Sequence, residues 1–232
     1  MSAVFSIPGA ALPRLLQLAS PALPVGGYSY SQGLEYAVAS ALVTDETSAL
    51  RWIGDVLDLS LSRYEAPLLA RAHSAWSDTD LAHVSALNDD WLASRESAEL
   101  RAETIQMGYS LRRLLHEMGD IDTRLLADLD QLGDIGFPLV WAAVAQHWSI
   151  PVAISLNVYL WAWLENQTMA ALKTVPLGQA CGQRLLFAIG ARIPALVERA
   201  LDLDDTHWSN FAPGHGLASI AHETQYSRLF RS

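Results

Sequence analysis

Apolar residues recur along most of the chain at intervals of three and four positions, which is the spacing of one face of an α-helix. The clearest case is Leu100, Met107, Leu111 and Leu114, which predict a long amphipathic helix that ends near Gly119. Strict alternation of apolar and polar residues, which is typical of half-buried strands, is nearly absent. The pattern therefore predicts an all-α fold: a single globular, bundle-like domain of about ten helices.

Prolines and glycines mark where the helical pattern is interrupted. Residues 24–28 contain two glycines and predict a turn, because glycine adopts positive φ at no steric cost. Pro67 predicts a break or kink in a helix, and Pro176 is placed to begin one. The most apolar stretch, residues 150–164, contains Pro151 and is shorter than the roughly 20 residues of a membrane span, so we expect a buried helix.

The two ends of the chain lack a sustained helical pattern. Residues 1–11 have no basic flank followed by an uninterrupted apolar core, which argues against an export signal. Residues 226–232 carry apolar and basic side chains in a short terminal segment, a kind that often orders only on binding. Because no repeat, low-complexity run or linker divides the chain, we interpret residues 1–232 as one domain in which residues 1–11 and 226–232 are flexible ends.

The composition narrows the possible functions. Hydrophobic residues make up 51% of the chain and charged residues 17%, which excludes a disordered protein because so much apolar surface has to be buried. The net charge of −10 argues against binding to nucleic acid or to an anionic membrane surface. The single cysteine, Cys181, excludes an internal disulfide, fits a reducing cytoplasm and is most simply a small buried hydrophobic residue.

The sequence contains no recognisable catalytic or metal-binding motif. It has no phosphate-binding loop, no GxGxxG and no GxSxG. None of its seven histidines forms a His-x-His or His-x3-His pair, although His215 and His222 lie seven positions apart, which leaves open a weak metal role or a surface or capping role. We therefore predict no catalytic residue, no metal site and no bound cofactor. The alternative is an all-helical enzyme whose acid/base pair, such as Glu35 and His147, is assembled only in three dimensions.

Three stretches are not explained by the patterning of a core, and the first is residues 19–35. It combines a tight turn with two tyrosines, and Ser29 and Gln32 have the spacing of a capping box ahead of the next helix. One interpretation is a capped turn. The other is a docking surface, because a tyrosine such as Tyr28 supplies a large contact area at little entropic cost.

The second stretch is residues 94–111, where we favour a structural role. Arg95 and Glu99 have the i,i+4 spacing of a helical ion pair. Gly108 costs about 1 kcal/mol relative to alanine inside a helix, so we expect it to permit the close approach of another helix.

The third stretch, residues 165–184, contains a stripe of small residues. On a helix that begins near Pro176, Gly178 and Gly182 share one face and Gln179 and Gln183 the neighbouring one. Small residues let two backbones approach, and buried glutamines need partners. We therefore expect a helix–helix seam here, either within the monomer or between two copies of the chain.

Taken together and in this order, these stretches resemble the UreF family of urease accessory proteins. The N-terminal signature corresponds to residues 20–29 (SPALPVGGYS) with 33–35 (GLE), and the middle motif to residues 94–96 (SRE) through 106–108 (QMG). The C-terminal part corresponds to residues 176–179 (PLGQ), 182–184 (GQR) and the arginine-containing tail. The resemblance extends over roughly residues 12–232.

The resemblance implies a cytoplasmic, all-α homodimer that acts through other proteins. It would join UreD (also called UreH) to the GTPase UreG, and the assembly would engage apo-urease and promote insertion of nickel. It would also regulate GTP hydrolysis by UreG. In this scheme the complex handles the nickel and UreG binds the GTP, so the chain itself carries neither.

The resemblance also implies which residues contact partners. By position these are Tyr28, Ser29, Glu35, Lys173 and Arg231. The tail's own pattern, apolar anchors flanked by arginines on an otherwise acidic chain, adds Arg228 and Phe230 as contact candidates. An arginine finger for the GTPase could come from Arg184 or Arg231, but we favour a scaffold that orders the loops of UreG. Lys173, alone among apolar neighbours, has a simpler alternative role, which is to extend to solvent along a helix edge.

Overall fold

The helical spacing of the sequence is realised as helices throughout the computed structural model, which describes residue 9 and residues 11–232. No strand occurs in these residues, so the prediction of an all-α fold is confirmed. The α-helices are α1 (Ala11–Ala19), α2 (Leu34–Ala39), α3 (Glu46–Val56), α4 (Ala66–Ser77), α5 (Leu81–Ala93), α6 (Ala98–Met118), α7 (Thr123–Gln131), α8 (Phe137–His147), α9 (Val152–Thr174), α10 (Gln179–Gly190), α11 (Ile193–Asp202) and α12 (Pro213–His222).

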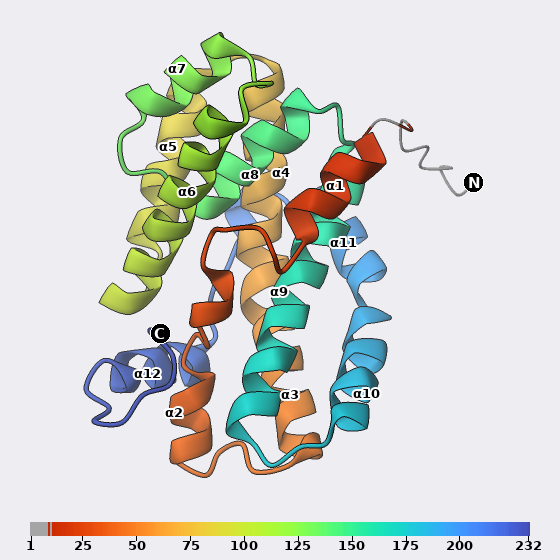
Figure 1. Cartoon of the computed structure of the whole chain (residues 1–232), viewed down its shortest axis with the longest axis vertical. Coiled ribbons are helices and arrows are strands. Elements are labelled where there is room, and N and C mark those ends of the chain that lie inside the picture. The colour runs from red at the N-terminus through yellow and green to blue at the C-terminus, as the bar shows by residue number, and fades with distance from the viewer. Residues whose placement is uncertain (1–8, 10) are drawn as a thin grey trace.

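Two helices, α8 and α9, organise the core. Residues 138–145 of α8 are all buried, as expected for a helix that is apolar on every side, and α8 packs against α4 and α6. α9 runs through the middle of the molecule and contacts α2, α4, α10 and α11 (Figure 1). The stretch around residues 150–164 therefore forms a largely buried helix, as predicted.

α3 continues into α4 through a π-helical segment, Leu57–Glu65, where the sequence predicts a break or kink near Pro67. Proline has no N–H to donate to a carbonyl of the preceding turn, and here it follows the π-helical segment directly. The N–H of Ser209 donates to the carbonyl of Arg63 at 3.1 Å. The long helix therefore continues past Pro67 with a change of helical pitch and is tied there to the C-terminal region.

Gly108, in the middle of α6, lets a neighbouring backbone come close. A Cβ atom built there would lie 2.1 Å from the carbonyl oxygen of Ile135. The expectation of a close approach is therefore confirmed, although the neighbour is the segment that leads into α8. α6 ends at Gly119, whose φ of 74° gives the left-handed C-cap that the sequence indicates.

One stretch, Gln179–Asp202, has the length and apolar composition of a membrane span. Core helices of folded proteins pass the same test, and here the stretch consists of α10 and α11, separated at residues 191–192. No membrane protein is indicated by it.

The two ends, which we expected to be flexible, differ in what the structure describes. Residues 1–8 and 10 of the expected N-terminal end lie outside the described residues, whereas Ala11 begins α1 and is buried. The tail 226–232 contains no helix and turns back along α12 toward the start of α2 (Figure 1). Tyr226 is fully exposed, but Phe230 and Ser232 are buried, so the last residues pack against the body of the protein.

Candidate functional site

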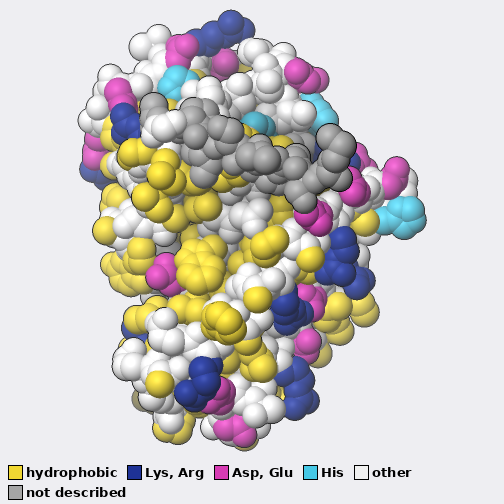
Figure 2. All heavy atoms as spheres, turned by 90° about the vertical axis from the view of Figure 1, so that its right-hand side faces the viewer, with side chains coloured by type: hydrophobic (Ala, Val, Ile, Leu, Met, Phe, Trp, Pro, Cys, Tyr) yellow, Lys and Arg dark blue, Asp and Glu magenta, His cyan; other side chains and the backbone are white. Residues whose placement is uncertain are grey.

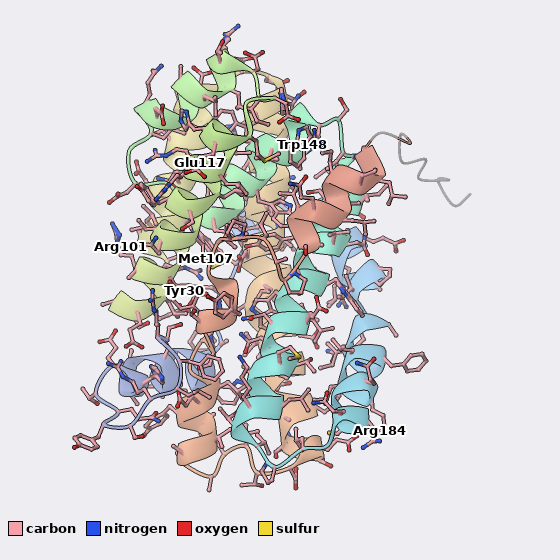
Figure 3. All side chains as sticks on the ribbon, in the orientation of Figure 1. Tyr30, Arg101, Met107, Glu117, Trp148 and Arg184 are labelled. Carbon is pink, nitrogen blue, oxygen red and sulfur yellow. The ribbon has the colours of Figure 1, made fainter. Side chains whose placement is uncertain are left out.

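Parts of all three unexplained stretches line one pocket, which lies between α6 and α9. Residues from the segment between α1 and α2 form its outer wall, α6 contributes Leu100 to Met107, and α9 contributes Tyr159 to Lys173. The cavity measures about 260 Å³. The segment between α1 and α2 lies between α6 and α9 in Figure 1, and Figure 3 places Met107 close to it, above Tyr30.

The inner walls of this pocket are mainly aromatic. Trp141 and Tyr159 meet edge to face with ring centroids 5.1 Å apart. The indole N–H of Trp91 donates to Thr104 at 2.8 Å, and that of Trp163 donates to the side-chain oxygen of Gln32 at 2.7 Å. Because both of these indoles have polar partners, their rings are held in place as rigid apolar surfaces.

Glu103 of α6 is a buried acid at the inner side of the pocket. One of its carboxylate oxygens accepts from the amide of Gln32 at 2.7 Å, and the other accepts from the hydroxyl of Ser232 at 2.7 Å. Burial raises its pKa to about 7, although these two hydrogen bonds favour the ionised form. Glu103 therefore titrates near neutral pH and connects the pocket to the tail.

Glu65, at the end of the π-helical segment, is a second acid of the pocket. It accepts a hydrogen bond from the hydroxyl of Tyr159. Burial raises the pKa of Glu65, and the positive charge of Arg95 lowers it by less. The two acids repel each other, since the charge on Glu65 also raises the pKa of Glu103.

Arg95 faces the pocket and makes no ion pair with Glu99. Its guanidinium carbon lies 3.6 Å from the centroid of the Trp91 ring, and it hydrogen-bonds to Ser94. The predicted i,i+4 pair is wrong because α6 begins only at Ala98, so Arg95 precedes the helix on which the spacing was counted. Glu99 turns instead to the C-terminal region.

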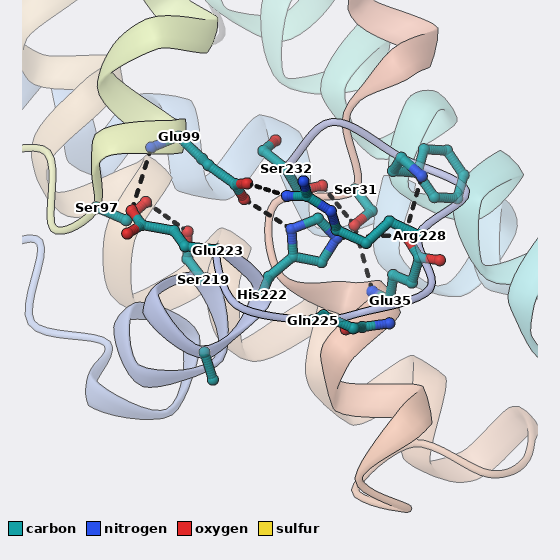
Figure 4. A network of polar contacts seen from close by, with 12 residues as sticks. Ser31, Glu35, Ser97, Glu99, Ser219, His222, Glu223, Gln225, Arg228 and Ser232 are labelled. Carbon is teal, nitrogen blue, oxygen red and sulfur yellow. Dashed lines mark hydrogen bonds and ion pairs between the residues drawn. The ribbon is translucent and has the colours of Figure 1, made fainter.

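A polar network fixes the tail to α2 and α6 (Figure 4). Glu35 accepts from the backbone N–H groups of Leu229 at 2.6 Å and Phe230 at 2.9 Å. The Nε2 atom of His222 lies 3.3 Å from the same carboxylate. In the structure, Glu35 therefore contacts the chain's own tail.

His222 lies between two carboxylates and is completely buried. Its Nδ1 atom is 2.6 Å from Glu99, which also receives Arg228 at 2.5 Å. Both ring nitrogens of His222 therefore have a carboxylate within hydrogen-bonding distance. The network thus joins α2, α6, α12 and the tail.

The other predicted contact residues lie around the pocket and the tail. Tyr28 is exposed and lines the pocket, and the carbonyl of Ser29 accepts from the N–H of Arg231 at 2.8 Å. The ammonium of Lys173 lies 5.4 Å from the centroid of the Phe230 ring and also faces the pocket. The structure thus brings the seven predicted residues to one side of the molecule, with Glu35 and Phe230 turned inward.

The expected seam is formed within the chain at only one of its four residues. A Cβ atom on Gly182 would lie 2.7 Å from the Cδ1 atom of Leu172, so α10 packs closely on α9 there. At Gly178 it would meet nothing within 4 Å, and Gln179 and Gln183 are exposed. α10 begins at Gln179, three residues after the predicted start.

Several residues of the site were missed, and one predicted pair is not assembled. Sequence reasoning did not find the pocket roles of Glu65 and Glu103, and it gave Gln32 a capping role that the structure replaces with its bonds to Glu103 and Trp163. The acid/base pair of Glu35 and His147 is not formed: Glu35 lies in α2 at one end of the molecule, whereas Trp148, next to His147, lies toward the other (Figures 1 and 3).

No group of three His, Cys, Asp or Glu side chains in the described part of the chain is arranged to hold a metal ion. His215 and His222 both lie on α12 and are buried, and burial lowers the pKa of His215 to about 4. Cys181 is buried and free, as predicted. Arg184, considered as an arginine finger, makes two contacts with Glu46, at 2.7 and 2.5 Å.

Comparison with known proteins identifies the family. A sequence model of UreF matches residues 43–190. The urease accessory protein UreF of Azoarcus sp. (strain BH72) is 59% identical over 225 residues, which cover 94% of each chain. The chain belongs to the UreF family of urease accessory proteins. UreF of Dechloromonas aromatica (strain RCB) is 54% identical over 222 residues, which cover 95% of this chain and 97% of that one.

Membership of the UreF family confirms the resemblance on which the site residues were chosen. These relatives are named as accessory proteins of urease and not as enzymes. All three motif stretches of the chain converge on the pocket, and each also meets the C-terminal tail. The pocket and the tail together are therefore the best candidate for the functional site.

Proposed function

We propose that this chain acts in the cytoplasm as a protein-binding scaffold for urease maturation. It joins UreD (UreH) to the GTPase UreG in a complex that engages apo-urease and inserts nickel, and it regulates GTP hydrolysis by UreG. The observation that carries this proposal is the surface formed by the pocket mouth and the tail. There the exposed Tyr28 and Lys173 lie next to a tail that presents Tyr226, Arg228 and Leu229 to solvent.

This surface has the properties of a site for another polypeptide. Aromatic and arginine side chains are enriched at protein–protein interfaces, and Tyr28 and Tyr226 are 65% and 104% exposed. The tail is anchored at Phe230 and Ser232, so its remaining side chains are held in place before a partner binds. Such preorganisation reduces the entropic cost of association.

The test is to remove residues 226–232 and to measure complex formation. We expect the truncated chain to retain its helicity but to co-elute less with UreD and UreG in size-exclusion chromatography, and to restore less urease activity in nickel-supplied cells that lack the protein. The matched control is Glu117→Ala, on the exposed side of α6, where the side chain is 59% exposed. Unchanged co-elution and unchanged urease activation by the truncated chain would rule out the proposed role of the tail.

We also propose that the chain forms a homodimer. Figure 2 shows that the face on the side of α10 and α11 carries large apolar patches among its charged groups. Phe187 of α10 is 82% exposed, and Leu16 of α1 is 62% exposed. Light scattering after chromatography should show a dimer that Phe187→Ser weakens, whereas Glu117→Ala, on the exposed side of α6, leaves it unchanged.

A further inference from the structure

The pocket is built to hold an elongated group that is apolar along its length and polar at its inner end. Its walls include Trp91, Trp141 and Trp163, and its inner side carries Glu65 and Glu103. A volume of about 260 Å³ is close to the lower limit of small-molecule pockets, and it suits a single long side chain better than a nucleotide.

The charges inside the pocket are unbalanced in favour of the acids. Glu65, Glu103 and Glu165 line it together with the basic residues Arg95 and Lys173. The charge of Arg95 lowers the pKa of Glu65 and Glu103, but burial outweighs it at both. Arg95 alone therefore does not compensate the burial of the two inner carboxyl groups, and a second cation beside them would stabilise their ionised forms.

The aromatic walls suit a cation as well as an aliphatic chain. Arg95 already lies with its guanidinium over Trp91, at 3.6 Å from the ring centroid, which shows that this wall accepts a cation. Lysine and arginine bury the methylene groups of their stems against apolar surface and direct the charged head to a polar site.

From this geometry we infer that the pocket binds the basic side chain of a partner polypeptide, with its aliphatic stem between the tryptophans and its ammonium or guanidinium group at Glu65 and Glu103. The inference rests on the proposed protein-binding role and specifies the chemistry of one contact. It assigns Glu103 as the residue that selects a cation, since its carboxylate already holds Gln32 on the pocket side.

Binding of a cation at this place should depend on pH. Glu103 must be ionised to pair with the cation, and the groups around it are Glu65, Arg95, Tyr30 and Tyr159. Burial raises the pKa of both tyrosines, so they remain uncharged in this range. With the pKa of Glu103 at about 7, the affinity for a cation should rise about tenfold between pH 6 and pH 8.

The experiment uses the full chain and two small probes of the same shape. N-butylguanidinium carries the charge, and N-butylurea is its neutral counterpart. Binding is followed by the indole N–H signals of Trp91 and Trp163 in NMR spectra, each assigned by a Trp→Phe variant. We expect N-butylguanidinium to shift both signals at millimolar concentration, with the pH dependence given above, and N-butylurea to bind at least tenfold more weakly.

Two variants separate the charge from the fold. Glu103→Gln should weaken binding of N-butylguanidinium about tenfold at pH 8 and remove most of its pH dependence, while Glu117→Gln, on the exposed face of the same helix, changes neither. If Glu103→Gln does not fold, the inference is still tested by the pH dependence of N-butylguanidinium binding to the unmodified chain and by the comparison of the two probes.

Three outcomes would overturn the inference. They are equal binding of the two probes, no shift of either indole signal, and displacement of N-butylguanidinium by a micromolar divalent metal ion, which would make this a metal site. If any of them occurs while the chain still supports urease activation, the proposed scaffold function stands and only this contact is wrong. If the unmodified chain neither supports urease activation nor binds the probe, both the scaffold function and this contact are wrong.

Discussion

The anchoring of the tail by Glu35 can be tested by the single substitution Glu35→Ala. The change removes the acceptor of the Leu229 and Phe230 N–H groups and one of the two carboxylates next to the buried His222. It adds no bulk, and alanine is the best helix former, so α2 itself should tolerate it. Any loss of stability therefore reports on the tail network.

The size of the loss follows from the burial of the groups left behind. A hydrogen bond to a charged group contributes about 1.5–3 kcal/mol, and Glu35 accepts two from the tail backbone. The side chain of Glu35 is 11% exposed and that of His222 is not exposed, but water can reach the freed N–H of Leu229. We expect the free energy of unfolding to fall by about 3 kcal/mol, which for a chain of this size lowers Tm by roughly 6–12 °C.

Two measurements check this expectation. Urea denaturation followed by circular dichroism gives the free energy of unfolding, and hydrogen exchange gives the protection of the Leu229 and Phe230 amides. Glu117→Ala is the control, because its exposed i,i+4 pair with Arg113 should contribute less than about 0.5 kcal/mol. If Glu35→Ala costs less than 1 kcal/mol and leaves both amides as protected as before, then Glu35 does not hold the tail.

Four further substitutions test the pocket and the helix contacts by urea denaturation. The folded-state pKa of Glu103 is raised to about 7 from 4.5, so its contribution to stability is present below pH 4.5 and is lost as the pH rises through 7. Relative to the parent, Glu103→Gln should therefore become more stable by about 2–3 kcal/mol between pH 5 and pH 8. A stability difference that does not change with pH would contradict the burial of this acid. Gly108→Ala should destabilise by about 2 kcal/mol or more despite its better helix propensity, because its Cβ would overlap the carbonyl oxygen of Ile135; a gain in stability would show that the two backbones can separate. Gly182→Ala should cost about 1 kcal/mol, since the side chain it meets can move, whereas Gly178→Ala should stay within about 0.5 kcal/mol; equal effects would contradict the one-sided seam.

Local features of the fold could be predicted because their causes are local. The extent of α6 follows from a regular apolar spacing and a glycine that tolerates the left-handed C-cap at residue 119. The burial of α9 follows from its apolar composition. The turn at residues 24–28 follows from its glycines, and Gly26 has a φ of 80°.

The polar partners in the site could not be predicted, because they depend on which distant segments meet. Glu103 and Ser232 are 129 positions apart, and Glu35 and Phe230 are 195 apart. One signal was present nevertheless. Glu103 lies three positions after Leu100 and four before Met107, which places a carboxylate on the apolar face of the helix. A charge on a buried face indicates a specific partner or a functional site.

The structure adds a second role to the one predicted for Glu35. Its place in the signature implies a partner on another protein, which stays a prediction, and the structure shows that Glu35 also has partners in the same chain. Gly33, two residues earlier, has a φ of 80°, and a Cβ there would lie 2.8 Å from the Ser219 N atom of α12. The signature therefore docks α2 onto α12, and the surface that remains for other proteins is built on this junction.

The two carboxylate oxygens of Glu103 connect this junction to the pocket. One oxygen binds Gln32, whose side chain also holds Trp163 of the pocket wall, and the other binds Ser232 at the end of the tail. A group that enters the pocket and pairs with Glu103 must compete with these bonds or strengthen the ionised form on which both depend. Occupation of the pocket and docking of the tail are thus coupled through one titratable side chain, and a partner that binds at either place will change the free energy of binding at the other.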